Sequence, residues 1–513
     1  MSKNITFGKE AIEKMMKGLD TAAEAVAGTI GPKGRNVYFE TDLTPEITND
    51  GATVANRVHL SDPQEDAGAY IIRNVTGQTN DDAGDGTTTT AVLTQAIIHE
   101  ALKRPENPAE IKDSLNEAGQ KVLKALAELS KPIKKTDVEQ VAYISAENTE
   151  IAKMITEIVE KLGDKAVINV EDSKTFKTEY EIVDGYEASI GFMSPHFIND
   201  RKSGKAVYES IPVLVSEKKI QNILDISPIF EEFKKAGINQ CVIVAEDIED
   251  SMLGMFITNK NLGTFNTLII RATGDVLKDI EGVTGAQRVS DQTGITFKSL
   301  KLEHLGEAKK IVCGPTKTLF LGNGEPSKKY ADFLESTVGN EDNMYLKKAL
   351  EQRIAKLKGG VATLRVAAPT DPERIYLRRK AEDAVKATLA ALEEGVVAGG
   401  GMALWRLAQE LEGVTIGEQI LKKAMTAPLR RIIENCGKDF TEVITSMPKD
   451  PSEDIIVGYN AKDDTYVDML ENGILDPSKV TRCALENSIS AGAIFITTFC
   501  LITDAKDKDG QNP

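Results

Sequence analysis

Both ends of this 513-residue chain carry helical patterns, whereas its middle alternates between strand-like and helical segments. Near the N-terminus one apolar face recurs at helical spacing, formed by Ile12, Met15, Met16, Leu19, Ala22, Ala23 and Val26. Ranges 402–447 and 479–503 have the same periodicity, and short β-rich runs stand at 167–170, 213–215, 241–245, 267–270 and 318–321. The simplest fold is a multi-domain α+β protein in which a mostly helical domain, assembled from both termini, carries an inserted α/β domain.

Two segments must connect the helical part with the insert, because the chain enters the insert and leaves it again. We place them at 129–183 and 362–393, which leaves 1–128 with 394–513 for the helical domain and 184–361 for the insert. A domain that is joined through two segments can swing as a rigid body about its hinges. The sequence therefore predicts three domains, with a small hinge domain between the two larger ones.

Charge and composition narrow the class of protein. Lys and Arg number 62 and Asp and Glu 79, so the net charge is 62 − 79 = −17, which opposes nonspecific binding to nucleic acid or anionic lipid. The five cysteines form no CxxC pair, which favours a reducing compartment. No secretory h-region is visible, and the apolar run 489–502 is shorter than the roughly 20 residues that span a bilayer, so we interpret it as a buried helix. We expect a soluble, cytoplasmic protein with no nucleic-acid or membrane partner.

The strongest candidate for a ligand site is the turn Gly84–Thr90 (GDGTTTT), which stands directly before an apolar helical run. A helix N-terminus offers unpaired N–H groups to an anion, and glycines let a phosphate approach the backbone closely. Asp85 would repel phosphate but suits a bridging Mg²⁺, which usually takes one or two carboxylates plus phosphate oxygens. The alternative is an N-cap aspartate in a polar turn without a ligand.

Other glycine-rich turns are less specific. The turn Thr29–Gly34 follows a helical segment and is typical of a helix C-cap, and Asn49–Gly51 is an ordinary turn signal. Three consecutive glycines at 399–401 precede a helical segment, which is costly in entropy and favours a close contact between backbone and ligand. His59, His99 and His304 have no metal-ligand spacing, so we expect any metal to arrive with a nucleotide.

Together these motifs resemble the group I chaperonins of the GroEL type. The resemblance is carried by motifs that occur in family order over essentially the whole chain: TIGPKGRNV (29–37), NDG (49–51), GDGTTT (84–89), AEDA (381–384), EEGVVAGGG (393–401), GYNA (458–461) and GILDPSKVTR (473–482). It implies that 1–128 with 394–513 form an equatorial ATP-binding domain, that 129–183 with 362–393 form an intermediate hinge, and that 184–361 form an apical substrate-binding domain.

The resemblance also implies a set of site residues for ATP and Mg²⁺, with K⁺ as a second cation. Asp383 would position the attacking water with help from Asp50, and Asp85 would hold the metal. The remaining nucleotide contacts would be Thr29, Ile30, Gly31, Pro32, Gly86, Thr87, Thr88, Thr89, Gly400, Asn460, Ala461 and Asp476, the last by accepting hydrogen bonds from the sugar. Asp85 and Asp383 are 383 − 85 = 298 positions apart, in different predicted domains, so hydrolysis would require the hinge to close.

Two apolar helical segments, at 223–233 and 248–257, could hold unfolded chains, because a promiscuous groove needs adaptable side chains such as Met. The alternative is that both helices bury these side chains against the strand at 241–245. By resemblance the client and co-chaperonin contacts would be Phe192, His196, Phe197, Phe230, Leu253 and Ile257.

The sequence departs from the family pattern in several places. Ser227 and Thr258 stand where apolar groove residues are usual, His196 replaces a Tyr, and Asn49 replaces a Lys beside the nucleotide. Segment 274–284 is shorter than usual, and the polar tail 504–513, which we expect to fray, lacks the glycine–methionine repeat.

The resemblance predicts an ATP-dependent chaperonin that assembles into one or two rings of seven subunits and binds unfolded clients. We expect a separate GroES-like co-chaperonin as a lid. Two alternatives stay open at this point: a divergent ring scaffold or holdase that no longer folds clients, and an ATP-dependent enzyme acting on a small molecule.

Overall fold

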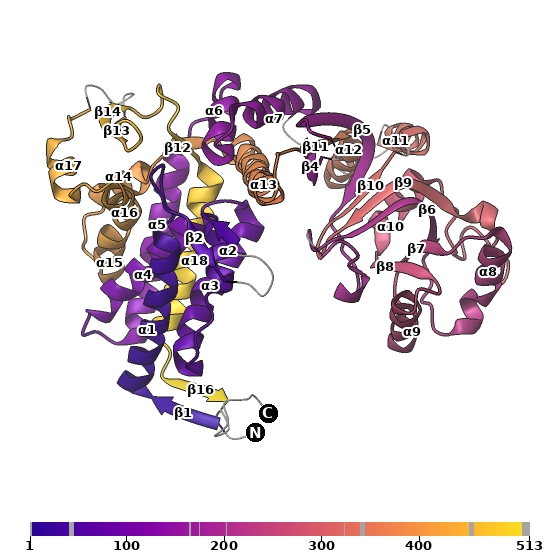
Figure 1. The fold of residues 1–513 in the computed structure, drawn as a ribbon, viewed down its shortest axis with the longest axis horizontal. Coiled ribbons are helices and arrows are strands. Elements are labelled where there is room, and N and C mark those ends of the chain that lie inside the picture. Colours follow the sequence, from indigo (N-terminus) through magenta and orange to yellow (C-terminus); the bar gives the residue numbers. More distant parts are fainter. Residues whose placement is uncertain are drawn as a thin grey trace. The chain divides into compact units, whose positions relative to one another are not determined.

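The computed structural model describes residues 3–40, 46–163, 166–173, 175–201, 203–322, 324–338, 344–450 and 456–504. The chain divides into two compact units. Unit 1 comprises Met1–Glu157, Val170–Thr178 and Arg365–Pro513, and unit 2 comprises Ile158–Asn169 and Glu179–Leu364 (Figure 1). The prediction that both termini build one part and that the other part is inserted is confirmed. The predicted three-domain boundaries stay a prediction, and most of the two hinge segments fall in unit 1.

Unit 1 is mainly helical because its segments carry one apolar face each. The long helices of its core are α1 (Gly8–Ala27), α3 (Pro63–Ala83), α4 (Thr87–Leu102), α5 (Pro108–Leu129) and α18 (Ser478–Ile496). The others are α2 (Gly51–Arg57), α6 (Lys135–Ala146), α13 (Asp371–Glu394), α14 (Met402–Glu410), α15 (Ile416–Ala424), α16 (Ala427–Asn435) and α17 (Phe440–Ser446), with α7 (Thr149–Leu162) reaching into unit 2. Leu93, Ile97, Leu115 and Leu485 are buried where α4, α5 and α18 meet.

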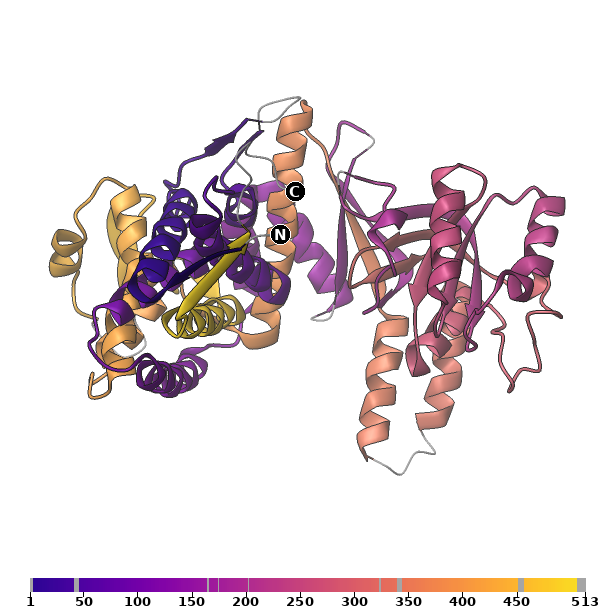
Figure 2. The ribbon, with the colours of Figure 1, turned by 90° about the horizontal axis from the view of Figure 1, so that it is seen from below.

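Among its described residues, unit 1 also contains four two-stranded sheets. They pair β1 (Lys3–Phe7) with β16 (Cys500–Asp504), β2 (Val37–Phe39) with β3 (Glu46–Thr48), β12 (Val396–Ala398) with β15 (Leu475–Pro477), and β13 (Val457–Asn460) with β14 (Thr465–Asp468). The expectation of a buried helix over 489–502 is therefore only partly right. Helix α18 ends at Ile496, and strand β16 then runs antiparallel to β1 (Figure 2), because the backbone of this β-branched run finds partners on the N-terminal strand.

In the part of the chain that the structure describes, no helix is long and apolar enough to span a membrane. All five cysteines are free thiols.

Unit 2 is built around an eight-stranded mixed sheet whose strand order is β4-β11-β5-β10-β9-β6-β7-β8. Its strands are β4 (Val167–Asp172), β5 (Glu179–Ala188), β6 (Ala206–Ser216), β7 (Gln240–Ala245), β8 (Asn266–Arg271), β9 (Gly306–Cys313), β10 (Thr318–Leu321) and β11 (Gly360–Val366). Strands β6, β7 and β8 are parallel, and β10 runs antiparallel to β5 and β9. All five predicted β-rich runs lie in these strands.

The helices of unit 2 are α8 (Ile223–Ala236), α9 (Asp250–Asn261), α10 (Gly274–Thr284), α11 (Gly324–Val338) and α12 (Met344–Lys358), with short 3-10 turns η1 (Pro195–Phe197) and η2 (Leu302–His304). Helices α11 and α12 lie side by side (Figure 2). Val242, Ile243, Leu268 and Ile269 form the buried centre of the sheet. The polar tail that we expect to fray lies outside the described residues after Asp504.

Glycine decides how closely α1 and α3 approach. A Cβ on Gly18 would stand 1.7 Å from the carbonyl oxygen of Glu65, and one on Gly68 would stand 1.8 Å from that of Met15. These carbonyl oxygens belong to the helix backbone, so neither can move away from an added Cβ unless its whole helix moves. The crossing that holds the N-terminal half of unit 1 together therefore requires glycine on both helices.

We predict that Gly68→Ala lowers the free energy of unfolding by about 1–3 kcal/mol, the usual cost of overpacking a close-packed contact. Gly77→Ala on the same helix is the matched control, because its Cβ would meet nothing within 4 Å. The control should raise stability by roughly 0.5–1 kcal/mol through helix propensity. Urea unfolding followed by circular dichroism measures both, and equal effects of the two substitutions would contradict the role of Gly68.

Candidate functional site

The turn between α3 and α4 has two residues that must be glycine. Gly84 ends α3 at φ 75° and Gly86 is the N-cap of α4 at φ 80°, both in the left-handed region. A Cβ on Gly84 would lie 2.0 Å from Cδ of Lys386, and one on Gly86 would lie 2.6 Å from Cγ1 of Val480. The turn is thus wedged between α13 and α18, and it presents the N-terminal N–H groups of α4.

Asp85, at the centre of this turn, is not the N-cap that the alternative interpretation required. Its Oδ1 accepts a hydrogen bond from the backbone N–H of Gly86 at 2.6 Å. Its Oδ2 accepts one from the hydroxyl of Ser145 on α6 at 3.0 Å. The carboxylate is therefore oriented from two sides while it keeps lone pairs for a cation.

The start of α4 is also the meeting point of two other motifs. Oγ1 of Thr88 lies 3.2 Å from Oγ1 of Thr29, which follows α1. A Cβ on Gly51, the first residue of α2, would lie 2.2 Å from that same Thr88 oxygen. Asp50 caps α2 by accepting from the N–H groups of Ala52 and Thr53 at 3.3 and 2.9 Å. Three motifs that are distant in sequence thus converge on one helix N-terminus.

The predicted adenine and ribose contacts form a neighbouring cluster. Ile30 and Ala461 are buried in one apolar cluster with Ile432, and Gly31 at φ 83° would bring a Cβ to 3.1 Å from that isoleucine. Pro32 is exposed beside them. Asn460 ends β13, where its side chain accepts from the N–H of Lys462 and donates to Asp463, both at 3.0 Å.

Asp476 faces the triple glycine. A Cβ on Gly399 would lie 2.9 Å from Oδ1 of Asp476, and Gly400 and Gly401 adopt φ of 63° and 78° and donate their backbone N–H groups to this carboxylate. Burial, and then the charge of Asp85, raise the pKa of Asp476 to about 7. The glycines are therefore required by contacts with the protein itself.

Asp383 lies in the middle of α13 and close enough to the turn for its titration to depend on two other carboxylates. Burial is the largest cause that raises its pKa well above the usual value, followed by the charges of Asp85 and Asp50, while Lys386 and Lys380 act in the opposite direction. The structure brings these three aspartates together within unit 1. The expectation that Asp85 and Asp383 lie in different domains stays a prediction.

Ion pairs hold α13 on both sides of Asp383, one within the helix and one at its C-terminal end. Lys380 Nζ donates to Oε1 of Glu147, which follows α6, at 2.8 Å. Arg482 on α18 donates to both carboxylate oxygens of Glu394 at 2.6 and 2.9 Å. Asp383 thus stands between two anchors on one continuous helix.

Sequence reasoning missed Ser145 and Lys386, which touch the turn from α6 and α13. Neither belongs to a recognisable motif. Only the packing of those helices against the turn reveals them.

Some residues of the predicted client surface on α8 and α9 are exposed to solvent, and others are buried in the core of unit 2. Leu224 is 75% exposed, and Leu262, just after α9, is 70% exposed. Phe230, Leu253, Ile257 and Phe192 are half-buried against the core, and His196 is exposed. The prediction is wrong for Phe197, which is 0% exposed: its ring is buried beneath the ammonium of Lys260, 6.0 Å from the ring centroid, and cannot meet a client.

Five other apolar side chains of the two helices follow the alternative interpretation, since they are buried: Ile226, Ile229, Phe233, Met252 and Phe256. The hydroxyl of Thr258 is exposed and donates to the carbonyl of Gly254 at 2.8 Å. A polar group thus interrupts the apolar surface without leaving an unpaired donor. Leu224, which lies in the segment 223–233 proposed from the sequence, and Leu262, which lies outside both proposed segments, are its most exposed members.

Comparison with known proteins identifies the family. The profile of the TCP-1/cpn60 chaperonin family matches residues 22–506. Chaperonin GroEL of Acholeplasma laidlawii (strain PG-8A) is 39% identical over 536 residues, which cover 100% of this chain and 99% of that relative. Crystal structures of the chaperonin gp146 from the bacteriophage EL 2 (Pseudomonas aeruginosa), obtained in the presence of ATP-BeFx in two crystal forms, share the fold with TM-scores of 0.72 and 0.67 at 19% identity, over 98% of this chain and 99% of the phage chain.

This agreement over the full length excludes the small-molecule enzyme that the sequence had left open. The chain belongs to the TCP-1/cpn60 chaperonin family, and it is a GroEL-like, ring-forming chaperonin that hydrolyses ATP.

Proposed function

We propose that ATP binds at the N-terminus of α4 and is hydrolysed there with Asp383 as the residue that orients the attacking water. The convergence of Asp50, Asp85 and Asp383, from three distant segments, on one helix N-terminus carries this proposal. The N–H groups of Gly86, Thr87, Thr88 and Thr89 would hold phosphate oxygens. Thr29, Ile30, Gly31, Pro32, Gly400, Asn460, Ala461 and Asp476 would enclose the nucleoside.

Asp85 fits the role of the magnesium ligand. Its hydrogen bonds with Gly86 and Ser145 fix the carboxylate, and the raised pKa of Asp383 reflects negative charge that a cation would neutralise. Among the described residues no group of three or more His, Cys, Asp or Glu side chains could hold a metal by itself. Mg²⁺ would share its coordination between Asp85 and phosphate oxygens, and would offset charge there. K⁺ as a second cation belongs to the same proposal.

The residues of this chain then have separate tasks. Asp383 would accept a hydrogen bond from water and orient it toward the terminal phosphate, and Asp50 would support that orientation. The equatorial, intermediate and apical division proposed from the sequence would let α13 move with the hinge. Because Asp383 would move with the hinge, the rate of ATP hydrolysis would depend on the position of the apical domain.

For the assembly we propose rings of seven subunits, in one or two layers, located in the cytoplasm, with a separate GroES-like co-chaperonin. The exposed side chains of Leu224 and Leu262, with the half-buried Phe230, Leu253 and Ile257, support a surface that clients and co-chaperonin would share. Phe192 and His196 would lie at its edge.

Replacing Asp383 separates binding from turnover. We predict that Asp383→Ala lowers kcat for ATP at least about 100-fold, the lower range for loss of a general acid–base group, while ADP affinity changes little. Steady-state phosphate release and titration with a fluorescent nucleotide provide the two readouts. Asp371→Asn, at the exposed start of the same helix, is the control and should leave kcat near the wild-type value. Normal turnover in Asp383→Ala would refute the assigned role.

The raised pKa of Asp383 has a consequence for stability in the absence of metal and nucleotide. Because the folded-state pKa lies above that of the unfolded chain, ionisation destabilises the fold progressively as pH rises above about 4 and through the folded pKa. Asp383→Asn should therefore raise Tm in EDTA by about 2–4 °C at pH 8 and by less at pH 5. Scanning calorimetry measures this, with Glu382→Gln as the neighbouring control. A gain that is larger at pH 5 would contradict the electrostatic cause.

The proposed client surface depends on exposed leucines. Leu224→Ser should weaken the suppression of aggregation of an unfolded protein several-fold, since burying a leucine contributes about 1.5–3 kcal/mol. Leu346→Ser, an exposed leucine of α12 outside this surface, is the matched control. ATPase activity without client should stay unchanged in both variants. Equal losses from both leucines would refute the location of the surface, and unimpaired binding without refolding would favour the non-folding scaffold.

A further inference from the structure

One aromatic side chain is almost fully exposed. Phe176 lies in the turn between β4 and β5 and is 97% exposed, more than any other large apolar residue described. Its turn is tied together internally: the hydroxyl of Ser173 donates to the carbonyl of Lys177 at 3.0 Å, and the N–H of Thr175 donates to that same hydroxyl oxygen at 3.1 Å. These hydrogen bonds join Ser173, Thr175 and Lys177, and the ring of Phe176 stands exposed between the last two.

An exposed ring on a structured turn requires a reason, because single apolar side chains at the surface normally pack at least partly on their neighbours. The turn SKTFKT places Phe176 between Lys174 and Lys177 in sequence. Lys177 is exposed and forms no ion pair with a described residue. The tip, which we call the knob, therefore presents the ring of Phe176 beside one exposed lysine, Lys177.

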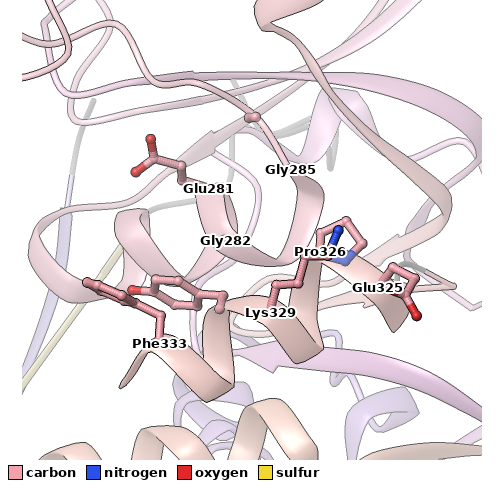
Figure 3. Close-up of a pocket in the computed structure, with 9 residues that line it drawn as sticks. Glu281, Gly282, Gly285, Glu325, Pro326, Lys329 and Phe333 are labelled. Carbon is pink, nitrogen blue, oxygen red and sulfur yellow. The ribbon is translucent and has the colours of Figure 1, made fainter. Parts of the chain in front are cut away.

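A matching hollow lies in unit 2 between α10 and α11 (Figure 3). Its volume is about 510 Å³, within the range of sites that enclose a side chain or a small ligand. Gly282 lies at its floor, where a Cβ would come within 2.2 Å of the ring of Tyr330. Phe333, 63% exposed, stacks beside that tyrosine at 6.4 Å between ring centroids. Glycine at position 282 thus lets Tyr330 pack directly on α10, and the rings of Tyr330 and Phe333 line the hollow.

The residues that line the hollow include two carboxylates, Glu281 and Glu325, and one ammonium group, Lys329. In Figure 3 the carboxylates of Glu281 and Glu325 lie well apart from each other, and Lys329 is drawn between these two residues. Glu281 is engaged by the guanidinium of Arg288, whereas Glu325 is exposed and makes no ion pair within the described residues. Glu325 is the carboxylate that is available to Lys177.

Assembly into a ring requires complementary surfaces on each subunit. The subunits of a ring contact one another head to tail, so each must carry two different surfaces that fit together. The knob and the hollow are two such surfaces on one chain: one carries an exposed aromatic ring beside Lys177, and the other is concave, lined by two aromatic rings and acidic at Glu325. We propose that Phe176 of each subunit inserts into the α10–α11 hollow of the neighbouring subunit in the ring, with Lys177 paired to Glu325. This inference requires ring assembly alone and none of the proposed nucleotide contacts.

Cysteine cross-linking tests the contact directly. Lys177→Cys combined with Glu325→Cys keeps both aromatic surfaces and replaces only the proposed ion pair. Under mild oxidation of the assembled protein we expect a ladder of covalent oligomers on a non-reducing gel, which a reductant collapses to monomer. The controls are each single variant, which reports the contribution of the native cysteines, and Lys177→Cys with Leu262→Cys, a residue of unit 2 that is 70% exposed and lies outside the hollow.

The outcomes are distinct. A ladder well above those of the controls supports the proposal. A ladder no stronger than theirs, or a fast-migrating band from a bridge within one chain, overturns it. Electron micrographs of the same samples verify that rings are present, so a failure of this contact is distinguishable from a failure of assembly or of ATP binding.

A second measurement does not depend on cysteine chemistry. Phe176→Ala and Phe333→Ala should each shift ring dissociation, followed by light scattering on dilution, to several-fold higher protein concentration. The double variant should be little worse than either single variant, because both remove the same contact. Fully additive effects, or no effect of Phe176→Ala, would overturn the proposal.

Discussion

The negative charge gathered at the N-terminus of α4 is the constraint on which the rest of unit 1 depends. Asp50, Asp85 and Asp383 come from three segments of the chain, and burial, followed by the charges of Asp85 and Asp50, raises the pKa of Asp383 well above its usual value. A protein tolerates such repulsion between carboxylates when a bound ligand or its cation neutralises their charge. The N-terminus of a helix beside the carboxylates is positive and suits an anion such as phosphate. The fold holds this arrangement through ion pairs on both sides of Asp383 in α13, from Lys380 and from Glu394, rather than through the three carboxylates themselves.

Close backbone contacts make the arrangement rigid. Glycines at 84, 86, 51 and 399 stand where any side chain would collide with Lys386, Val480, Thr88 or Asp476. The same device joins α1 to α3 through Gly18 and Gly68, far from any proposed ligand. Glycine in this protein therefore serves helix packing as often as it serves a binding site, and only the identity of the facing atom separates the two uses.

The apolar residues of helices α8 and α9 in unit 2 have two different roles. Residues on α8 and α9 at similar spacing separate into a buried set that completes the sheet core and an exposed set that is left for partners. Phe197 and Leu224 illustrate the division: the aromatic ring packs beneath Lys260, whereas the leucine faces solvent. Phe176 adds a separate exposed ring, on a turn that is held by its own hydrogen bonds.

Periodicity in the sequence was sufficient to predict the helices at both ends, the strands of the insert and the insertion itself, because amphipathic spacing reflects which face each segment buries. Motif order was sufficient to predict the family and to name candidate residues from Thr29 to Asp476. The sequence could not predict that 500–504 becomes a strand, that Phe197 is buried, or that Ser145 and Lys386 contact the turn between α3 and α4. Those outcomes depend on contacts between segments that lie 60 or more positions apart in the chain. Such contacts arise from tertiary packing, which no local pattern encodes.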